Sequence, residues 1–540
     1  EIVFGDWSSD VCSSDLSALV GSEYFIENSF NFSAGTRLSP TDLIYTMNVA
    51  SEANGVPYSF RTGYEIASLF GQVNYDFDYK YLVGLTFRYD GTSRLGNNKY
   101  DFFPGISLGW NAHNEDFFKD SGVSAYVSKL KPRISYGVNG NIDILSNFGV
   151  FGSYGATSVY NGYSGYVNNG LPLLDLKWER STTLNLGLDM ALFGNRMTVI
   201  ADYFIRDVKD KLAGLTLPLW TGFSSITTNN GTLQNRGLEL QVNGDVLKSS
   251  DFNWNLGLTF YRVRNYAKAL PENGVEKNRQ GGTEIYDPET GGTIYVGGLQ
   301  EGERVGYDVI TAYIFEGVYK TQEDIDAHAG RIVEFAQDKD TRFLGDAIWK
   351  DVNGDNVINY LDREVIGRRT PDFVGGLTSA MSWKGFNLFV KTDFTVGHMI
   401  INGRRVKGIA QTQGNQNGPL EIRDTWTAEN PTSNIPIFTL VDRQKNHLAG
   451  GGDQGSMTSS SSRMWEKGDF LALREVTLSY DLKGADVNNL FKDLRLYVTG
   501  SNLAYFNKFS GSSPEESGDG IDYGRFPLPR TYTLGLSVTF

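Results

Sequence analysis

The stretch TYTLGLSVTF, Thr531–Phe540, ends the chain and alternates apolar and polar residues without a break. Tyr, Leu, Leu, Val and Phe hold its even positions, and Thr, Thr, Gly, Ser and Thr hold its odd positions. Because successive side chains of a β-strand point to opposite faces, one face of this segment is apolar and the other is small and polar. Such a pair of faces is expected where one side of a sheet touches lipid and the other touches water.

The same alternation recurs upstream. We count roughly 14–16 segments of a length suited to crossing a bilayer as tilted strands. Regular alternation marks 73–79, 83–89, 105–110, 133–138, 184–190, 253–260, 475–480 and 493–498, and less regular alternation marks 22–34, 196–207, 234–246, 310–319, 373–383 and 386–396. Short turns and long segments alternate between them, as in outer-membrane barrels. The sequence therefore predicts an all-β fold, an incomplete antiparallel transmembrane β-barrel with long extracellular loops.

Composition narrows the function. The 540 residues carry a net charge of −14, which disfavours nucleic acid as a partner. Mean hydropathy is −0.30, and the chain lacks the run of about 18 apolar residues that a membrane-spanning helix needs. The four histidines have no metal-ligand spacing, and we find neither a GxSxG nor a Walker motif. We therefore predict that the protein is not an enzyme.

The first residues differ from the rest. Residues 1–16 have neither the basic region nor the apolar region of a signal peptide. Their segment WSSDVCSSDL, which holds the sole cysteine, Cys12, looks like a translated sequencing adapter. We interpret 1–16 as a leader that is not native, and 17–540 as barrel sequence.

A water-soluble β-sandwich or propeller also alternates, because its apolar face is then a core. Two features favour the membrane barrel, namely the flush aromatic end of the chain and separations between strands as long as 397–468. A soluble carbohydrate-binding β-protein stays as the alternative from another class.

Several ordered segments resemble the SusC/RagA family of TonB-dependent outer-membrane transporters of Bacteroidetes. They are RYDGTSR at 88–94, LKPRISYGVNGN at 130–141, LKWERSTTLNLGLDMALFGNR at 176–196, NNGTLQNRGLEL at 229–240, DTWTAENPT at 424–432 and FPLPRTYTLGLSVTF at 526–540. The resemblance covers nearly everything from about residue 22 onward.

The resemblance implies a location in the outer membrane and a barrel closed by an N-terminal plug. It also implies energy supplied through TonB, a SusD-like surface lipoprotein as a lid, and oligosaccharide or peptide as cargo. We expect this chain to be the C-terminal part of such a barrel, with Phe540 resembling the terminal aromatic that assembly machinery recognises. Polar residues would line the path of the cargo. They include Asn185, Asp189, Asn253 and Asn255. A passive porin or a surface adhesin on the same barrel is the alternative function.

One loop has the spacing of a calcium site. In the segment 351–362, oxygen-bearing side chains fall at positions 1, 3, 5, 9 and 12, as in an EF-hand. The candidate ligands are Asp351, Asn353, Asp355, Asn359 and Asp362, with the backbone carbonyl of Val357. Asn356 replaces the usual glycine, and Asp362 is shorter than the usual glutamate. A polar turn without metal is the alternative. Apart from Ca²⁺ at this loop, we predict no cofactor.

Loop tryptophans are candidate contacts for cargo. Trp220, Trp349 and Trp426 fall in long segments between the predicted strands, where an indole ring can stack on a sugar. Rings in such positions also pack loops or mark the membrane interface. Both interpretations stay open from the sequence.

Overall fold

The computed structural model describes residues 14–41, 43, 46–47, 50–55, 57–335, 339–410, 420–437, 461–483, 492–515, 520–524 and 526–539. Cys12 and Phe540 therefore lie outside the described residues. Strand β1 begins at Ser14, inside the segment 1–16. The interpretation of that segment as a leader stays a prediction.

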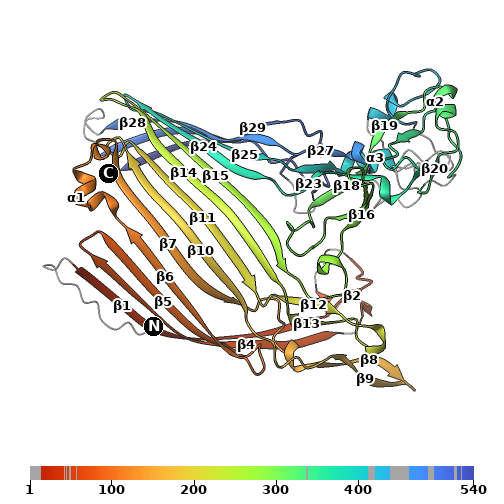
Figure 1. Ribbon diagram of the computed structural model, residues 1–540, viewed down its shortest axis with the longest axis horizontal. Coiled ribbons are helices and arrows are strands. Elements are labelled where there is room, and N and C mark those ends of the chain that lie inside the picture. Colours follow the sequence, from red (N-terminus) through yellow and green to blue (C-terminus); the bar gives the residue numbers. More distant parts are fainter. Residues whose placement is uncertain are drawn as a thin grey trace.

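Fourteen antiparallel strands form one sheet, in which every strand pairs with its sequence neighbours among them (Figure 1). They are β1 (Ser14–Ser33), β4 (Tyr58–Phe77), β5 (Tyr81–Thr92), β6 (Tyr100–Trp110), β7 (Val127–Asn141), β10 (Glu179–Leu192), β11 (Met197–Lys209), β14 (Thr232–Lys248), β15 (Phe252–Ala269), β24 (Phe373–Trp383), β25 (Phe386–Val396), β28 (Phe470–Lys483), β29 (Asp493–Asn507) and β31 (Thr531–Thr539). We call this sheet the wall. Its strand number agrees with the prediction of roughly 14–16.

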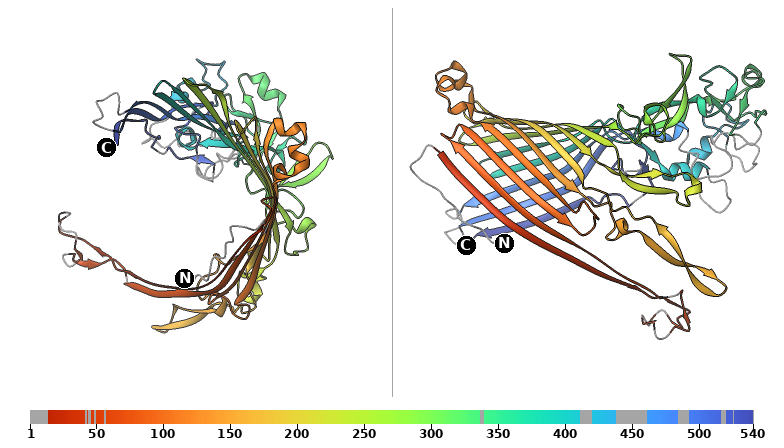
Figure 2. Two further views of the ribbon diagram at one scale, coloured as in Figure 1. Left: turned by 90° about the vertical axis from the view of Figure 1, so that its left-hand side faces the viewer. Right: turned by 60° about the horizontal axis from the view of Figure 1, so that its bottom comes forward.

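The wall curves into an open trough, with β1 at one rim and β31 at the other (Figure 2). Within the described ranges, each of these two rim strands pairs on one side only. None of the helices in the described part of the chain is long and apolar enough to span a membrane.

One face of the wall is apolar from rim to rim, because the registers align the apolar residues of successive strands. One row consists of Leu16, Tyr75, Val83, Leu108, Ile134, Leu186, Tyr203 and Leu238. A second row consists of Phe252, Trp383, Phe386, Tyr480, Leu496 and Leu536. We call this the outer face. Its side chains are exposed, as Leu478 (50%) and Val498 (51%) show.

The two ends of the wall differ. At one end, short turns join the strands, and the two-residue turn Lys384–Gly385 has positive φ at both positions (44° and 91°), as a type I′ hairpin requires. A longer connection at this end holds α1 (Asp116–Lys119). At the other end lie the long loops, on the right of Figure 1. We call these the turn end and the loop end.

Some strands are longer than a bilayer needs. Strand β4 has 20 residues, whereas a tilted membrane strand needs about 9–11. The residues of β4 that belong to the outer face form its outward row. This row is apolar from Phe77 to Leu69 and changes, toward the loop end, to Glu65 and Arg61. About half of β4 therefore continues past the apolar band, toward the loop end.

The expectation of a wall strand at 310–319 is wrong. These residues form β18 (Val309–Tyr313) and β19 (Phe315–Val318), which pair with β23 (Arg363–Arg368) and β21 (Ala347–Trp349) at the loop end. Ile310, Ala312 and Val318 are buried. Alternation marks any half-buried strand, so it does not separate a lipid-facing strand from one that packs on a small core.

The described residues between 309 and 368 form a small folded unit, which we call the loop module. Besides these four strands it holds α2 (Gln322–Ala327), β20 (Ile332–Val333) and β22 (Val357–Ile358). Its core consists of Tyr313, Val333, Ala347, Trp349 and Ile358, with Phe315 and Phe335 packed against it. A separate cluster of Ile401, Val406 and Met464 lies under the neighbouring loops.

Candidate functional site

The face of the wall opposite the outer face is polar, and it holds the four predicted lining residues. Asn255 and Asn243 exchange hydrogen bonds through their amides, at 3.0 and 3.1 Å. The Asn253 amide donates to the Ser382 hydroxyl at 3.4 Å. These contacts join adjacent strands, so the inner face presents a ladder of hydrogen-bonding groups to the inside of the trough.

An ion triplet lies farther along the inner face. The Arg133 guanidinium donates to Asp189 Oδ1 and to Asp202 Oδ2, at 2.9 Å each. The three residues come from β7, β10 and β11, which are neighbours in the sheet. Asn185 and Arg133 both line a cavity of about 490 Å³ on this face. The arrangement suits contact with water and polar solutes rather than with lipid.

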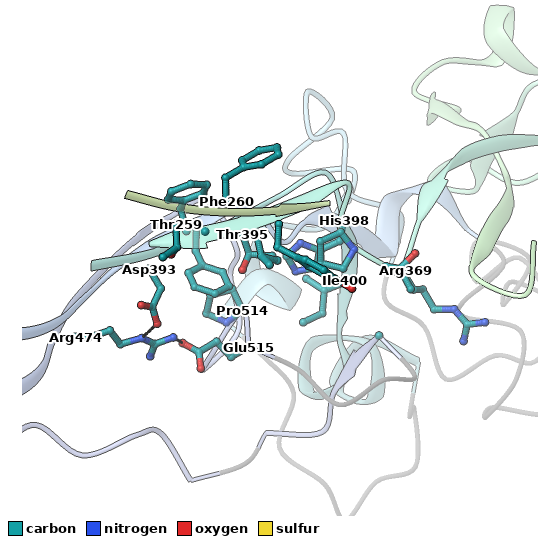
Figure 3. Close-up of a pocket in the computed structure, with 18 residues that line it drawn as sticks. Thr259, Phe260, Arg369, Asp393, Thr395, His398, Ile400, Arg474, Pro514 and Glu515 are labelled. Atoms are coloured by element: carbon teal, nitrogen blue, oxygen red, sulfur yellow. Dashed lines mark hydrogen bonds and ion pairs between the residues drawn. The ribbon is translucent and has the colours of Figure 1, made fainter. Parts of the chain in front are cut away.

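A larger cavity of about 820 Å³ opens where the inner face meets the loop end (Figure 3). Asp393 on β25 and Glu515 lie on either side of Arg474, which comes from β28. Arg474 Nε lies 2.5 Å from Asp393 Oδ2, and its Nη2 pairs with Glu515. Tyr505 also accepts from Arg474 Nη1, at 2.6 Å. The two neighbouring strands and the loop that holds Glu515 thus fix this guanidinium in one orientation.

His398 lies on the other side of this cavity, beside Ile400 (Figure 3). The side chain is buried, and its Nδ1 has no hydrogen-bond partner among the described residues. Burial lowers the pKa of His398, so the ring is neutral at pH 7. A neutral ring beside apolar neighbours makes this side of the cavity less polar than the Arg474 side.

Ion pairs fasten the loops that surround the cavity. Arg405 on α3 (Gly403–Ala410) donates to Glu421 at 2.7 and 3.0 Å and lies 3.4 Å from Glu466. Arg463 pairs with Glu421 as well. Burial acts to raise the pKa of Glu421, but the two guanidiniums hold it below its ordinary value. The network joins segments that are distant in the sequence and fixes their positions at the loop end.

The predicted calcium ligands form a tight turn in the loop module. Asp351 accepts from the backbone N–H groups of Gly354 (2.8 Å) and Asn356 (2.9 Å), and Asp355 accepts from that of Val357 (2.7 Å). Asp362 is fully buried and binds two backbone N–H groups at 2.8 Å.

In the described part of the chain, no three His, Cys, Asp or Glu side chains gather as a metal site. Because the carboxylates already bind backbone donors, the geometry fits the polar turn without requiring a cation. Asn356 takes the left-handed conformation (φ 64°), which asparagine tolerates better than most residues. Binding of Ca²⁺ at Asp351, Asn353, Asp355, Val357, Asn359 and Asp362 stays a prediction.

The three predicted tryptophans do not come together. Trp349 is 2% exposed in the core of the loop module, and Trp426 is 7% exposed. Gly345 (φ 91°) lies against Trp426 and Ile437, where an added Cβ would meet carbon atoms of both at 2.7 Å. Trp220 is 86% exposed at the tip of a loop. Only Trp220 keeps the free ring surface that stacking on cargo needs, and its role stays a prediction.

Comparisons with known proteins place this geometry in a family. The family model described as "TonB dependent receptor-like, beta-barrel" matches residues 4–503. TonB-dependent receptor P3 of Formosa agariphila is 30% identical, over 97% of this chain and 50% of its own length. SusC of Bacteroides thetaiotaomicron is 27% identical, over 89% of this chain and 44% of its own length. The structure of the RagAB peptide transporter superposes with a TM-score of 0.75 at 22% identity, covering 98% of this chain and 54% of that chain.

These matches confirm the resemblance that the sequence motifs carry, and they confirm the β-barrel fold. The family lies in the outer membrane and consists of receptors rather than enzymes, as predicted. They give no support to a soluble carbohydrate-binding protein. The chain spans about half the length of the curated relatives that it matches. It belongs to the TonB-dependent receptor β-barrel family, and SusC and RagAB are among the proteins that it is similar to.

Proposed function

We propose that the full-length protein imports oligosaccharide or peptide cargo across the outer membrane, with energy supplied through TonB. The observation that carries the proposal is the pair of faces of the wall in a chain of this family. An apolar face runs from rim to rim, and the face behind it is polar. A polar cargo needs such an inner face, lined by residues that include Asn185, Asp189, Asn253 and Asn255.

We propose that a SusD-like lipoprotein covers the loop end. The loop module and the network around Glu421 support a partner there, because folded loops offer a fixed surface rather than a mobile one. TonB would act from the turn end, through a plug encoded outside this chain. The peptide transporter RagAB shares the fold, and SusC shares the family.

Uptake in the native host tests the import proposal. The intact gene is deleted and restored, and growth on candidate glycans and peptides is compared with and without TonB. Import predicts that growth on one cargo needs both the gene and TonB. Uptake that continues without TonB identifies a passive porin, and surface binding without uptake identifies an adhesin.

Copurification tests the partner proposal. The full-length protein is tagged in the outer membrane and extracted in mild detergent, and we expect a lipoprotein from a neighbouring gene to copurify. In a second variant, replacement of Glu421 by Gln loosens the loop network while the wall stays intact. If the lipoprotein copurifies equally after residues 309–368 are removed and the loop network is broken, the loop end is not its docking surface.

A further inference from the structure

Four arginines meet in a notch at the loop end of the wall. Strand β15 pairs with β24 only as far as Tyr261 and Val374. Beyond that point its backbone pairs with residues 303–305 instead, so β15 separates from β24 and leaves a notch. Arg262, Arg264 and Arg304 line this notch. The fourth arginine, Arg368, is the last residue of β23. We call Arg262, Arg264, Arg304 and Arg368 the arginine cluster.

The arginine cluster has fewer carboxylates than guanidiniums in the described part of the chain. Asp308 accepts from Arg368 Nη1 at 2.7 Å, and a threonine hydroxyl binds its other oxygen. One oxygen of Asp372 lies 3.9 Å from Arg264 Nη2 and 3.8 Å from Arg304 Nη1. Both distances exceed a hydrogen bond. Four guanidiniums against two carboxylates leave an excess of two positive charges.

This excess contrasts with the two inner-face arginines described above and with the net charge of the chain. Arg133 and Arg474 each lie between two carboxylates, and the whole chain carries a net charge of −14. The Nε atoms of Arg262 and Arg264 are buried without a hydrogen-bond partner among the described residues. Burial lowers the pKa of Arg304, and the nearby charges of Arg368 and Arg264 lower it further. An added anion would relieve this repulsion.

The notch has room for such an anion. It is a cavity of about 390 Å³ lined by Arg262, Arg264 and Arg304 and by two tyrosines, Tyr261 (39% exposed) and Tyr307 (59% exposed). It adjoins the larger cavity of Figure 3, because the two share lining residues that include Tyr261. Exposed rings beside guanidiniums suit a sugar ring that carries a charged group, because the ring can stack while the charge pairs with arginine.

We infer that the arginine cluster binds the carboxylate or sulfate groups of an acidic oligosaccharide as the cargo enters. The inference rests on the proposed import function and narrows its cargo to an anionic class. Arg262 and Arg264 continue the outward row of β15 beyond its apolar residues, so the site holds the charged group at the outer edge of the mouth, where it selects acidic cargo over neutral cargo. The electrostatic part of this binding weakens as added salt screens the charges, since the Debye length is about 10 Å at 0.1 M salt.

Binding to full-length protein in detergent tests this inference, with dextran, carboxymethyl dextran and dextran sulfate as probes. The three share one backbone and differ in charge, so they separate carboxylate from sulfate. We expect tighter binding of one or both charged probes than of dextran. Replacing Arg304 by Gln should weaken that binding about tenfold or more. Arg180→Gln is the control, because Arg180 also lies in an ion pair at the loop end, at 3.6 Å against 3.8 Å for Arg304.

Each outcome bears on the inference. Equal affinity for all three probes overturns it, as does an Arg304→Gln variant that binds like Arg180→Gln. If the Arg304→Gln variant fails to fold, Arg264→Gln removes one charge of the same cluster from a more exposed side chain (40%), and unchanged affinity for the charged probes then overturns the site. Polyglutamate is the peptide probe, and if it loses affinity in the variant as the charged dextrans do, the oligosaccharide part is wrong. TonB-dependent import of neutral cargo alone would contradict this site while leaving the import proposal intact.

Discussion

Apolar side chains of the wall and of the loop module face opposite environments. In the wall, Leu478 and Val498 are 50% and 51% exposed on the outer face. In the loop module, Trp349 and Ile358 are 2% and 0% exposed in a closed core. Both regions are built from β-strands. Alternation therefore identifies a strand, whereas the length of the strand and the strands that it pairs with decide whether its apolar face meets lipid or a core.

The largest effect is expected from Trp349→Ala in the loop module. The ring lies 5.9 Å from that of Phe315 and 6.0 Å from that of Phe335, so its removal leaves a cavity. We expect the loop module to lose about 3–5 kcal/mol of stability. Limited proteolysis should then cut inside residues 309–368 while the barrel keeps its resistance to heat in detergent.

Trp220→Ala is the matched control, because Trp220 is 86% exposed. It should leave the proteolysis pattern unchanged. If the two variants behave alike, the loop module has no core of its own and the contrast with the wall fails.

A pH effect confined to the loop module is expected from Asp346. Burial raises the pKa of Asp346 to about 7, and one of its oxygens has no hydrogen-bond partner among the described residues. The folded pKa lies above the ordinary value of about 3.9, so the charged form is penalised only in the folded state. Stability of the module therefore falls as pH rises from about 4 to about 7, by at most about 4 kcal/mol.

Hydrogen exchange of the loop module between pH 4 and pH 8, corrected for the intrinsic rate, measures this effect. Asp346→Asn should reduce the dependence on pH. Part of it should remain, because burial also raises the pKa of Asp362. An unchanged slope in the variant means that Asp346 is not the titrating group.

The two faces of the wall can be compared directly in β28. Leu478→Arg places a charge on the outer face, at an expected cost of about 2–4 kcal/mol near the middle of the bilayer. Thr477→Arg places the same charge on the inner face, close to Glu475, whose carboxylate lies 2.7 Å from the Thr477 hydroxyl. Folding of the full-length protein into lipid vesicles should be impaired by the first substitution far more than by the second. Equal impairment would contradict the assignment of the faces.

The smallest effect is expected in the 351–362 turn. Asp355→Ala removes hydrogen bonds to the backbone of Val357 and to the Asn353 amide, which are worth about 1 kcal/mol each. Calorimetry of the full-length protein at millimolar calcium then decides between the two interpretations. Heat that disappears in Asp355→Ala supports calcium. Absence of heat, with the same loss of stability in EDTA, supports the bare turn.

The wall could be predicted well from the sequence, because alternation within a strand shows which of its residues share a face. In 184–190 and in 531–540 the period of two is visible without any knowledge of the partners. Prediction failed for 310–319, where the same period belongs to a packed core. Trp349 packs on Phe315 and Trp426 packs on Gly345, both distant in the sequence, so the burial of the two rings was not visible in the chain.

The arginine cluster was missed for a similar reason. Its members come from β15, from residue 304 and from β23, and no spacing joins them. Only the separation of β15 from β24 brings them to one notch. A signal was present in the sequence, since Arg262 and Arg264 interrupt an otherwise apolar outward row in β15. That signal marks the end of the apolar band but says nothing of the other two arginines.

The extra length of β4 has a mechanical consequence. Past Leu69, its ladder with β1 continues to Tyr58, a distance of about 36 Å along the strand. The pairing of β4 with β5 ends at Ile66 and Thr92, so beyond that point β1 and β4 continue as a two-stranded ribbon past the apolar band. Cargo therefore first meets the protein well outside the membrane. A movement that parts the two strands of this ribbon breaks its ladder of hydrogen bonds, whereas twisting of the ribbon keeps them.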